Sequence, residues 1–441
     1  SNVPPKLMAI LTQRLEFANP KWIENARMSR WNRGTPKILK FYDKIKGGGL
    51  WIPRGYMRQL ILLCRHHNIK FQIEDKRRLL KKAGFSFTGR LKPFQKVAVD
   101  KMLSKEFGTL SSPTGSGKTV MALYIISQRN QPALIVVHTR ELAVQWIERI
   151  ETFLKIPADE VGFIGGGKKK IGEKISVALV QSLYKCALEV SQNIGNLVVD
   201  ECHRAPSRTF TEAITEFDSK YMLGLSATPY RRDKLSKLIF WHIGDVHHEV
   251  DKNHLIETGD VLPVSVTIRE TDFKPYFDPV NQYSKMLLEL TMNDKRNRLI
   301  AADVARVTHK EKGVCLVLSD RKKHCETLLS LLKYKYKISA DILTGSLSTD
   351  HRQKVLHRLT NGKVKVLIAT GQLIGEGFDC KGLSTLFLAT PIRFSGRVVQ
   401  YLGRILRPAP GKEKARLFDY VDIHVDTLKN AAGARQKVYN A

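Results

Sequence analysis

Residues 112–119 read Ser-Pro-Thr-Gly-Ser-Gly-Lys-Thr, and residues 196–203 read Asn-Leu-Val-Val-Asp-Glu-Cys-His. A glycine-rich turn that ends in Lys-Thr wraps backbone N–H groups around nucleotide phosphates. Lys118 then reaches the outer phosphates, and Thr119 offers its hydroxyl to Mg²⁺. A carboxylate pair at the end of an apolar strand supplies a second contact to that magnesium and a base for the attacking water. Together, the two segments predict hydrolysis of a nucleoside triphosphate.

The candidate nucleotide site therefore has two parts. The predicted phosphate contacts in the turn are Thr114, Gly115, Ser116, Gly117, Lys118 and Thr119. Position 112 carries Ser where such turns commonly have Gly or Ala, and Ser is small enough for the turn. In the second part, Asp200 is the predicted magnesium contact together with Thr119, and Glu201 is predicted to polarise the attacking water.

Short apolar runs recur along the chain, and each ends at polar residues. They cover residues 133–137, 175–180, 196–199, 221–225, 313–318, 364–368 and 383–388. Near-continuous apolar strands separated by helical stretches are typical of parallel sheets covered on both faces. Ligands bind beyond the carboxyl ends of such strands, where these polar residues fall. The pattern predicts two α/β lobes with a cleft between them, joined near residues 248–263.

Residues 1–88 form a separate and strongly basic block. The whole chain has 73 lysines and arginines against 42 acidic residues, a formal charge of +31, and this block alone holds 19 against 5. Glycines within 44–53 predict a β-hairpin, the spacing at 58–67 predicts a helix, and the alternation at 69–73 predicts a strand. We expect a small α/β module. Its charge indicates a partner with a phosphate backbone, while solubility and attraction to anionic lipid are the alternatives.

The cysteines and the apolar segments indicate the compartment. The six cysteines are scattered with no Cys-x-x-Cys pair, which favours reduced packing residues in a cytosolic protein over a zinc site or a disulfide framework. No run of 18 uninterrupted apolar residues is present, and the opening residues lack the apolar segment of a secretion signal. We expect a cytoplasmic protein of a bacterium or a phage-infected cell, with no membrane partner.

From about residue 90 onward, the motifs resemble those of superfamily 2 helicases, which have two RecA-like lobes. Asp200, Glu201 and His203 resemble the DExH box of that family, in which the histidine relays between the lobes. Gln95 resembles the glutamine that reads the adenine edge and confers a preference for ATP, although its residue type alone also fits a helix start. Ser226-Ala-Thr228 resembles the short motif that couples hydrolysis to movement on DNA.

The most specific match lies near the end of the chain, in Gln400-Tyr-Leu-Gly-Arg-Ile-Leu-Arg407. Helical spacing places Gln400, Arg404 and Arg407 on one face. The resemblance implies that Arg404 and Arg407 are arginine fingers for charge developing on the γ-phosphate, which contribute roughly 10³–10⁵ in rate in related phosphoryl-transfer systems. The alternative is a pair of surface arginines on a helix.

Other segments that follow predicted strands resemble contacts to nucleotide or nucleic acid. Gly375-Glu-Gly-Phe-Asp379 resembles a segment that touches both, with Gly377 and Asp379 on the nucleotide side. The remaining segments resemble grips on the phosphates of a single strand, for which guanidinium groups and helix N-terminal N–H groups are suited. The implied nucleic-acid contacts are Arg140, Gln181, Ser182, Thr344, Gly345 and Thr370.

Within the superfamily, the chain most resembles the XPB/RadD/UvsW-like group, because the box reads Asp-Glu-Cys-His and a basic module precedes the motor. The resemblance implies a DNA-binding module at 1–88, an ATP-binding lobe at 89–250 and a second lobe at 251–441. We expect an ATP- and Mg²⁺-dependent motor that acts on single-stranded, forked or four-way-junction DNA, by branch migration or fork reversal, in recombination, repair or replication. The alternatives are the motor subunit of a restriction or defence complex, an RNA helicase, and a nucleic-acid-binding scaffold with an inactive motor.

Overall fold

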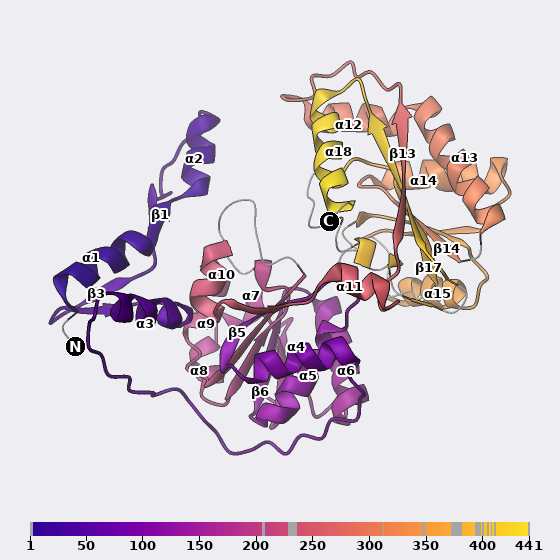
Figure 1. Ribbon diagram of the computed structural model, residues 1–441. Helices are drawn as coiled ribbons and strands as arrows, with labels where there is room; N and C mark the ends of the chain where they lie inside the picture. The colour runs from indigo at the N-terminus through magenta and orange to yellow at the C-terminus, as the bar shows by residue number, and fades with distance from the viewer. Residues whose placement is uncertain are drawn as a thin grey trace. The chain divides into compact units, whose positions relative to one another are not determined.

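A computed structural model shows two compact units, one formed by residues 1–112 and 119–250 and the other by residues 113–118 and 251–441. Each unit contains a sheet of parallel strands covered by helices, which confirms the predicted α/β class (Figure 1). The structure describes residues 3–204, 208–227, 236–311, 313–345, 349–371, 382–392, 398, 401–403, 405–406, 408–409 and 412–439.

The first unit contains an eight-stranded sheet in the spatial order β12-β5-β11-β10-β6-β9-β7-β8. Neighbours from β12 to β7 run parallel, and the edge strand β8 pairs antiparallel with β7. The strands are β5 (Phe107–Ser111), β6 (Ala133–Val137), β7 (Gly162–Gly165), β8 (Lys168–Lys170), β9 (Ile175–Leu179), β10 (Asn196–Val199), β11 (Tyr221–Ser226) and β12 (Val246–Glu249). The four apolar runs predicted as strands in this part of the chain are confirmed as β6, β9, β10 and β11.

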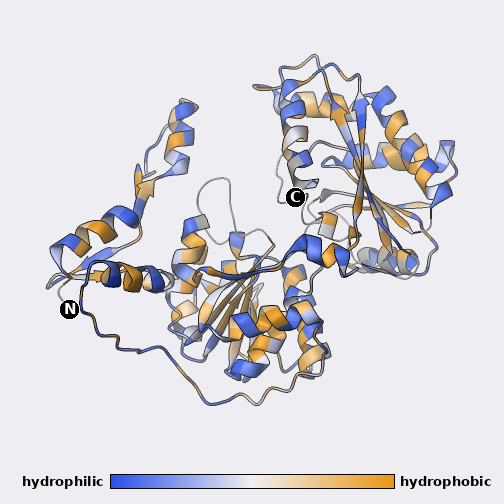
Figure 2. Cartoon of the chain, in the orientation of Figure 1, coloured by the Kyte–Doolittle hydropathy of each residue, from blue (hydrophilic) through white to orange (hydrophobic). Residues whose placement is uncertain are grey.

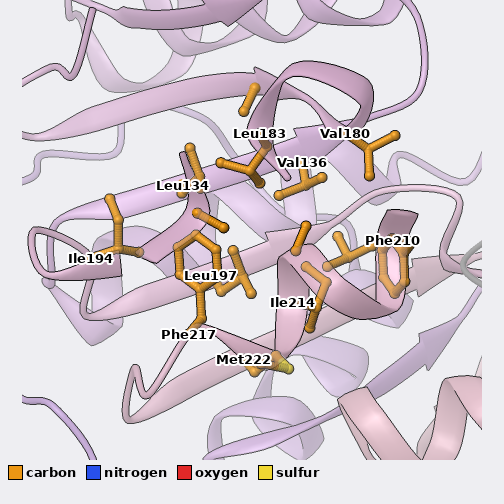
Figure 3. Close-up of a cluster of buried hydrophobic side chains, with 14 of the residues drawn as sticks. Leu134, Val136, Val180, Leu183, Ile194, Leu197, Phe210, Ile214, Phe217 and Met222 are labelled. Atoms are coloured by element: carbon orange, nitrogen blue, oxygen red, sulfur yellow. The ribbon is translucent and has the colours of Figure 1, made fainter. Parts of the chain in front are cut away.

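Helices on this sheet bury its middle strands. They are α4 (Pro93–Leu103), α5 (Lys118–Arg129), α6 (Arg140–Leu154), α7 (Val180–Leu183), α8 (Ala187–Ser191), α9 (Arg208–Thr215) and α10 (Ser236–Ile243). Leu134 and Val136, two residues apart on β6, point to the same face and pack with Phe210 and Ile214 of α9 (Figure 3). Fully burying one such side chain contributes about 1.5–3 kcal/mol. Figure 2 shows hydrophobic residues concentrated in the strands of the first sheet, and hydrophobic and hydrophilic residues mixed along the helices that cover it.

The N-terminal residues form short elements, including two two-stranded sheets, β1-β2 and β3-β4. They are α1 (Pro5–Arg14), β1 (Glu16–Ala18), α2 (Pro20–Arg27), β2 (Ile38–Lys40), β3 (Asp43–Ile45), β4 (Gly49–Trp51) and α3 (Met57–His66). The predicted hairpin is confirmed, because β3 and β4 pair antiparallel across Gly47 and Gly48, whose φ values of +85° and +78° favour glycine. The predicted helix is α3. The strand predicted at 69–73 is wrong, since those residues pair with no strand and leave Phe71 and Ile73 half-exposed.

The N-terminal elements pack directly on α10 of the first unit. Leu11 and Leu63 join Leu238 and Trp241 in one buried cluster. A Cβ at position 55 would lie 2.3 Å from a backbone carbonyl oxygen of α10, so Gly55 permits this close approach.

A single arginine ties the N-terminal elements to the loop before β11. Arg54 donates to the backbone carbonyls of Phe217, Ser219 and Lys220 at 3.4, 2.8 and 3.4 Å. Burial, assisted by the nearby Arg77 charge, lowers the pKa of Arg54 to about 10. The guanidinium therefore replaces water with backbone acceptors at the junction of the module and the sheet.

The segment from Arg78 to Thr88 runs along the first unit as a strap. Arg78 exchanges backbone hydrogen bonds with Asp218 and Lys220, and Leu80 exchanges two with the side chain of Gln131. Thr88 N–H donates to the carbonyl of Phe153 at 2.9 Å, just before α4 begins. These bonds satisfy the backbone of a segment that has no strand or helix of its own.

The second unit contains a six-stranded sheet in the order β13-β18-β17-β14-β16-β15, with every neighbouring pair parallel. The strands are β13 (Val264–Thr271), β14 (Val314–Leu318), β15 (Ala340–Leu343), β16 (Val366–Ala369), β17 (Leu383–Leu388) and β18 (Ala415–Asp422). The helices include α11 (Lys252–Glu257), α12 (Tyr283–Met292), α13 (Asp294–Lys310), α14 (Lys322–Ser330), α15 (Thr349–Thr360) and α18 (Asp426–Tyr439). The three apolar runs predicted here are confirmed as β14, β16 and β17.

Charged pairs lie inside this second unit as well as apolar side chains. Arg296 of α13 bonds Asp422 at 2.8 Å, and Arg435 of α18 bonds Asp419 at 2.8 Å, with all four groups at most 2% exposed. His324 of α14 is also buried, between Ser319 and Asn297. Among the residues that the structure describes, none of the helices combines the length and apolar character needed to cross a bilayer.

Candidate functional site

Polar segments that follow four strands of the first sheet share one edge. β5 leads into residues 112–119, β6 into 138–140, β9 into 181–182 and β10 into 200–203. Because β5, β11, β10, β6 and β9 are parallel neighbours, their carboxyl ends lie on the same side of the sheet. The fold therefore brings most of the first-lobe residues predicted from sequence to a single edge.

The glycine-rich turn has a backbone shape suited to an anion. Gly115 and Gly117 have φ values of +93° and +87°, which favour glycine. Ser116 donates from both N–H and Oγ to the Pro113 carbonyl, at 3.3 and 2.7 Å, and Lys118 Nζ donates to the same oxygen at 3.3 Å. Helix α5 begins at Lys118, so its N-terminal N–H groups and its dipole add to the attraction for negative charge.

Asp200 lies directly beyond β10 with both carboxylate oxygens engaged. Its Oδ1 accepts from the N–H of Glu201 at 2.9 Å, and its Oδ2 accepts from the indole Nε1–H of Trp146 at 2.9 Å. Asp200 is 8% exposed and Trp146 is 2% exposed.

Glu201 and His203 complete the group of polar residues beyond β10. Glu201 has a φ of +50°, an uncommon backbone conformation for a residue with a side chain. Its Oε2 is buried and makes no hydrogen bond among the described residues, although it lies 3.1 Å from Nδ1 of His203. That nitrogen also lies 3.1 Å from Oγ of Ser226, at the end of β11. The histidine thus contacts two neighbouring strand ends.

The predicted nucleic-acid contacts of the first lobe lie on the next strands along the same edge. Thr139 accepts from the N–H of Leu142 at 3.3 Å and caps α6, which places Arg140 at the first helical position with an exposed side chain. Gln181 is exposed and donates to the carbonyl of His138 at 3.2 Å, with Ser182 beside it. The ends of β6 and β9 therefore form one surface.

In the second unit, the predicted contacts follow two adjacent strands. Thr344 and Gly345 come directly after β15, and Thr370 comes after β16. The N–H of Thr370 donates to the carbonyl of Leu343 at 3.2 Å, so the two segments lie side by side. Thr344 is buried, whereas Gly345 is exposed.

Two models of known protein families match separate parts of the chain. Residues 88–231 match the family model "Type III restriction enzyme, res subunit", and residues 294–409 match "Helicase conserved C-terminal domain". Three relatives carry helicase or translocase names. A putative ATP-dependent RNA helicase, L396, of Acanthamoeba polyphaga mimivirus is 28% identical over 80% of this chain and 68% of its own length. The DNA 3'-5' translocase XPB2 of Sulfurisphaera tokodaii is 27% identical over 72% of this chain and 78% of its own. The ATP-dependent DNA helicase uvsW of Enterobacteria phage T4 is 24% identical over 92% of this chain and 83% of its own.

This chain is a superfamily 2 helicase of the XPB/UvsW group. It hydrolyses ATP, as the pair of matched domains and the helicase-named relatives indicate. The fold agrees: the structure of S. cerevisiae Dbp5 bound to RNA and ADP BeF3 matches with a TM-score of 0.55, at 17% identity, over 79% of this chain and 87% of that one. Both sheets are therefore RecA-like lobes, as the sequence predicted.

Several predicted site residues of this helicase lie outside the described residues. They are Gly377, Asp379, Gln400, Arg404, Arg407 and Thr228. Gln95 is described and lies on α4, 5% exposed, where its Oε1 accepts from the N–H of Lys92 at 2.9 Å. This bond caps the start of α4, which is the alternative to adenine recognition that the sequence left open for Gln95.

Sequence reasoning missed Trp146 of the helicase. It lies on α6 between Ala143 and Ile150, a spacing that predicts a residue on the buried face of a helix. Only its indole N–H distinguishes it from a packing residue, because the partner of that group comes from another strand end. The proximity of β6 and β10, given by the sheet order, was the missing information.

Proposed function

We propose that this chain is an ATP-dependent DNA helicase that remodels branched DNA, by branch migration or fork reversal, in recombination, repair or replication. The observation that carries the proposal is the combination of the site at the carboxyl edge of the first sheet with a basic N-terminal module packed on α10. Residues 1–88 hold 19 lysines and arginines against 5 acidic residues. The match to the uvsW helicase of phage T4 covers 92% of the chain, and therefore extends into this module.

The geometry of the turn suits ATP as the substrate. Gly115 and Gly117 give the backbone the curvature that directs N–H groups to one point, where the phosphates would lie. Thr114 Oγ1 is buried and makes no hydrogen bond among the described residues, so it is available to a ligand. Lys118 would exchange its bond to the Pro113 carbonyl for the outer phosphates.

Thr119, Asp200 and Glu201 suit Mg²⁺, because a hydroxyl and carboxylates are the hard oxygen ligands that this ion takes together with substrate phosphates. When bound, Mg²⁺ would neutralise charge that develops on the phosphates. Thr119 and Asp200 would hold it. Glu201 would orient the attacking water through its unbonded Oε2 and receive its proton. His203 would transmit changes at Glu201 to the end of β11 through its contact with Ser226.

The remaining assignments extend the proposal. Gln95 would read the adenine, and Gly377 and Asp379 would contact the nucleotide. Gln400, Arg404 and Arg407 would stabilise negative charge on the γ-phosphate. Arg140, Gln181 and Ser182 would grip the DNA phosphates from the first lobe, and Thr344, Gly345 and Thr370 would do so from the second. Two independent grips, opened and closed by the ATP cycle, would move the protein along a strand.

The test is ATP hydrolysis and strand displacement by the full chain on a matched set of single-stranded, blunt duplex, forked and four-way-junction DNA and an RNA duplex. We expect the greatest activity on forks and four-way junctions. Equal activity on RNA duplex would contradict the choice of DNA. Hydrolysis stimulated by duplex without strand separation would instead support a restriction-type translocating motor, a function that the helicase-named relatives do not favour.

A further inference from the structure

An arm formed by residues 16–40 projects from the N-terminal module. It consists of β1, α2 and β2, and Figure 1 shows α2 at its far end, beyond α1 and β1. No residue of α2 is buried. The arm has six lysines and arginines and two acidic residues. It also leaves apolar side chains exposed: Ile23 by 50%, Met28 by 51%, Trp31 by 84% and Ile38 by 45%.

The base of the arm is fixed to the rest of the first unit. β1 and β2 pair antiparallel, from Glu16 with Lys40 to Ala18 with Ile38. Phe17 and Phe41 stack on each other with ring centroids 5.7 Å apart, and both rings contact Trp241 of α10, at 5.9 and 5.4 Å. The arm is therefore anchored by aromatic packing to the same lobe that carries the glycine-rich turn's strand, β5.

The loop at the tip of the arm is folded by side-chain hydrogen bonds. Asn25 Nδ2 donates to Asn32 Oδ1 at 3.0 Å, and Asn32 Nδ2 donates to the carbonyl of Trp22 at 3.1 Å. The N–H of Arg30 donates to the carbonyl of Asn25 at 2.8 Å. These bonds fix the loop on both sides of Trp31, while the Trp31 side chain itself is exposed.

The charges beside this tryptophan point to a phosphate-bearing partner. Arg27, Arg30 and Arg33 are exposed and form no ion pair with any described residue. Trp22 is different, because Lys37 lies over its ring at 5.3 Å and the ring is only partly exposed. Trp31 is therefore the aromatic group of the tip whose ring face is available, and it stands between two unpaired arginines.

We propose that Trp31 stacks on an unpaired base at the branch point of DNA, with Arg30 and Arg33 on the flanking phosphates. The inference rests on the proposed function and adds a ligand subsite to it. An aromatic ring between cations is the arrangement by which proteins bind single-stranded nucleic acid without reading its sequence. Bases inside a duplex already stack on their neighbours, so a ring face is offered only where pairing ends.

The test is equilibrium binding without ATP, using a forked DNA and a fully paired duplex of the same length, by fluorescence anisotropy. Trp31→Ala should weaken binding to the fork roughly 5- to 150-fold, the usual range for losing one base–aromatic stack, and should leave duplex binding unaltered. Trp31→Phe, which keeps a ring, should restore most of the affinity. Tyr334→Ala is the matched control, because Tyr334 is 67% exposed with Lys333 over its ring and lies in the second unit.

A second readout locates the contact. 2-Aminopurine placed at the first unpaired position of the fork should be quenched by the wild-type chain and not by Trp31→Ala. The proposal would be overturned if Trp31→Ala bound the fork and the duplex as tightly as wild type does. It would also be overturned if the variant lost the same affinity for both DNAs, because the arm would then hold paired DNA. Because these measurements need no ATP, they remain decisive even if the strand-displacement panel shows no preference for branched DNA.

A different observation assigns a role to Trp146. Its indole N–H holds Oδ2 of Asp200 at 2.9 Å, and it lies on α6, the helix that presents Arg140 at its first position. The geometry points to Trp146 as a positioning residue that fixes the Asp200 carboxylate for Mg²⁺, on the assumption of the nucleotide site proposed above. Groups that orient a metal ligand typically change metal affinity 10- to 100-fold when they are removed.

Calorimetric ADP binding with and without Mg²⁺ tests this role, since it does not depend on turnover. Trp146→Phe keeps the ring and removes the N–H, so we expect the gain in ADP affinity from Mg²⁺ to fall about 10-fold while Mg²⁺-free binding stays the same. Trp241→Phe is the matched control, because Trp241 is buried in the N-terminal cluster. An unchanged Mg²⁺ gain in Trp146→Phe would overturn the positioning role, whereas an absence of ADP binding by the wild-type chain would contradict the nucleotide site itself.

Discussion

Both lobes of this helicase are built on a sheet of mainly parallel strands, but different side chains follow the strands at the two carboxyl edges. At the carboxyl edge of the first sheet lie a lysine, an aspartate, a glutamate and an arginine, in Lys118, Asp200, Glu201 and Arg140. At the second edge, the predicted contacts Thr344, Gly345 and Thr370 are small and uncharged, while Asp320 and Arg321 follow β14. Parallel strands direct whatever follows them to one edge, so the residues after each strand determine which sheet can perform chemistry.

The interiors differ in how buried charge is paired. In the first unit the buried Arg129 donates to the Asn196 side chain and to backbone carbonyls, whereas the second unit buries two arginine–aspartate pairs and a histidine. Buried charges are expensive when they lose a partner. The second lobe is therefore the one whose stability depends on buried ion pairs.

The largest expected effect comes from breaking a buried ion pair in the second lobe. Arg435→Met leaves Asp419 buried, with the Tyr439 hydroxyl at 2.8 Å as a remaining partner, and should destabilise this lobe by about 3–5 kcal/mol. Hydrogen exchange of the β18 amides measures the loss. In Arg435→Met/Asp419→Asn the uncompensated charge is gone, so most of the stability should return. If the single variant exchanges like wild type, the pair does not hold the lobe together.

The next effect concerns the first edge. Lys118→Ala should lower ATP turnover by ~10²–10³-fold, the usual consequence of removing one group that stabilises transition-state charge, while DNA binding is retained. Thr370→Ala, the matched change at the second edge, should instead weaken DNA binding and leave DNA-independent turnover within a few-fold of wild type. Steady-state hydrolysis and anisotropy on the same preparations make the comparison. Full activity of Lys118→Ala would show that the turn is not the ATP site.

A smaller effect depends on pH. Burial, together with the nearby Arg296 charge, lowers the pKa of His324 to about 3. The unfolded chain, with a pKa near 6.5, binds the proton first as pH falls. Stability is therefore full above about pH 6.5 and falls below it by up to ~1.4 kcal/mol per pH unit until the folded pKa is reached. His324→Gln should flatten this slope between pH 7.5 and 5.5 in hydrogen exchange of the second lobe. A slope identical to wild type would assign the pH dependence to another group.

The smallest effect is at the start of α6. Thr139→Ala removes the cap that places Arg140 and should destabilise the helix by about 1 kcal/mol. Thr139→Asn, which can cap, should not. Thermal unfolding of the first lobe distinguishes the two, and equal losses would mean that the cap bond contributes nothing.

Sequence reasoning reached the elements whose signal is local. Apolar runs gave β6, β9, β10, β11, β14, β16 and β17, and the fixed spacing of the glycine-rich turn gave the nucleotide loop. It failed at 69–73, where alternation alone suggested a strand although these residues pair with no strand among those that the structure describes. It also could not give contacts made between distant segments. Trp146 reaches Asp200 because the sheet order places β6 beside β10, and Arg54 reaches the carbonyls before β11 because the N-terminal elements pack on α10.

Glu201→Gln tests most directly whether ATP is bound and hydrolysed at the carboxyl edge of the first sheet, with Glu201 acting on the water. One sample of the variant is assayed for binding of a fluorescent ATP analogue and for hydrolysis. We expect analogue binding close to wild type, because Lys118 and the turn are intact, together with a loss of hydrolysis of at least ~10²-fold. Hydrolysis at the wild-type rate would place the catalytic base elsewhere.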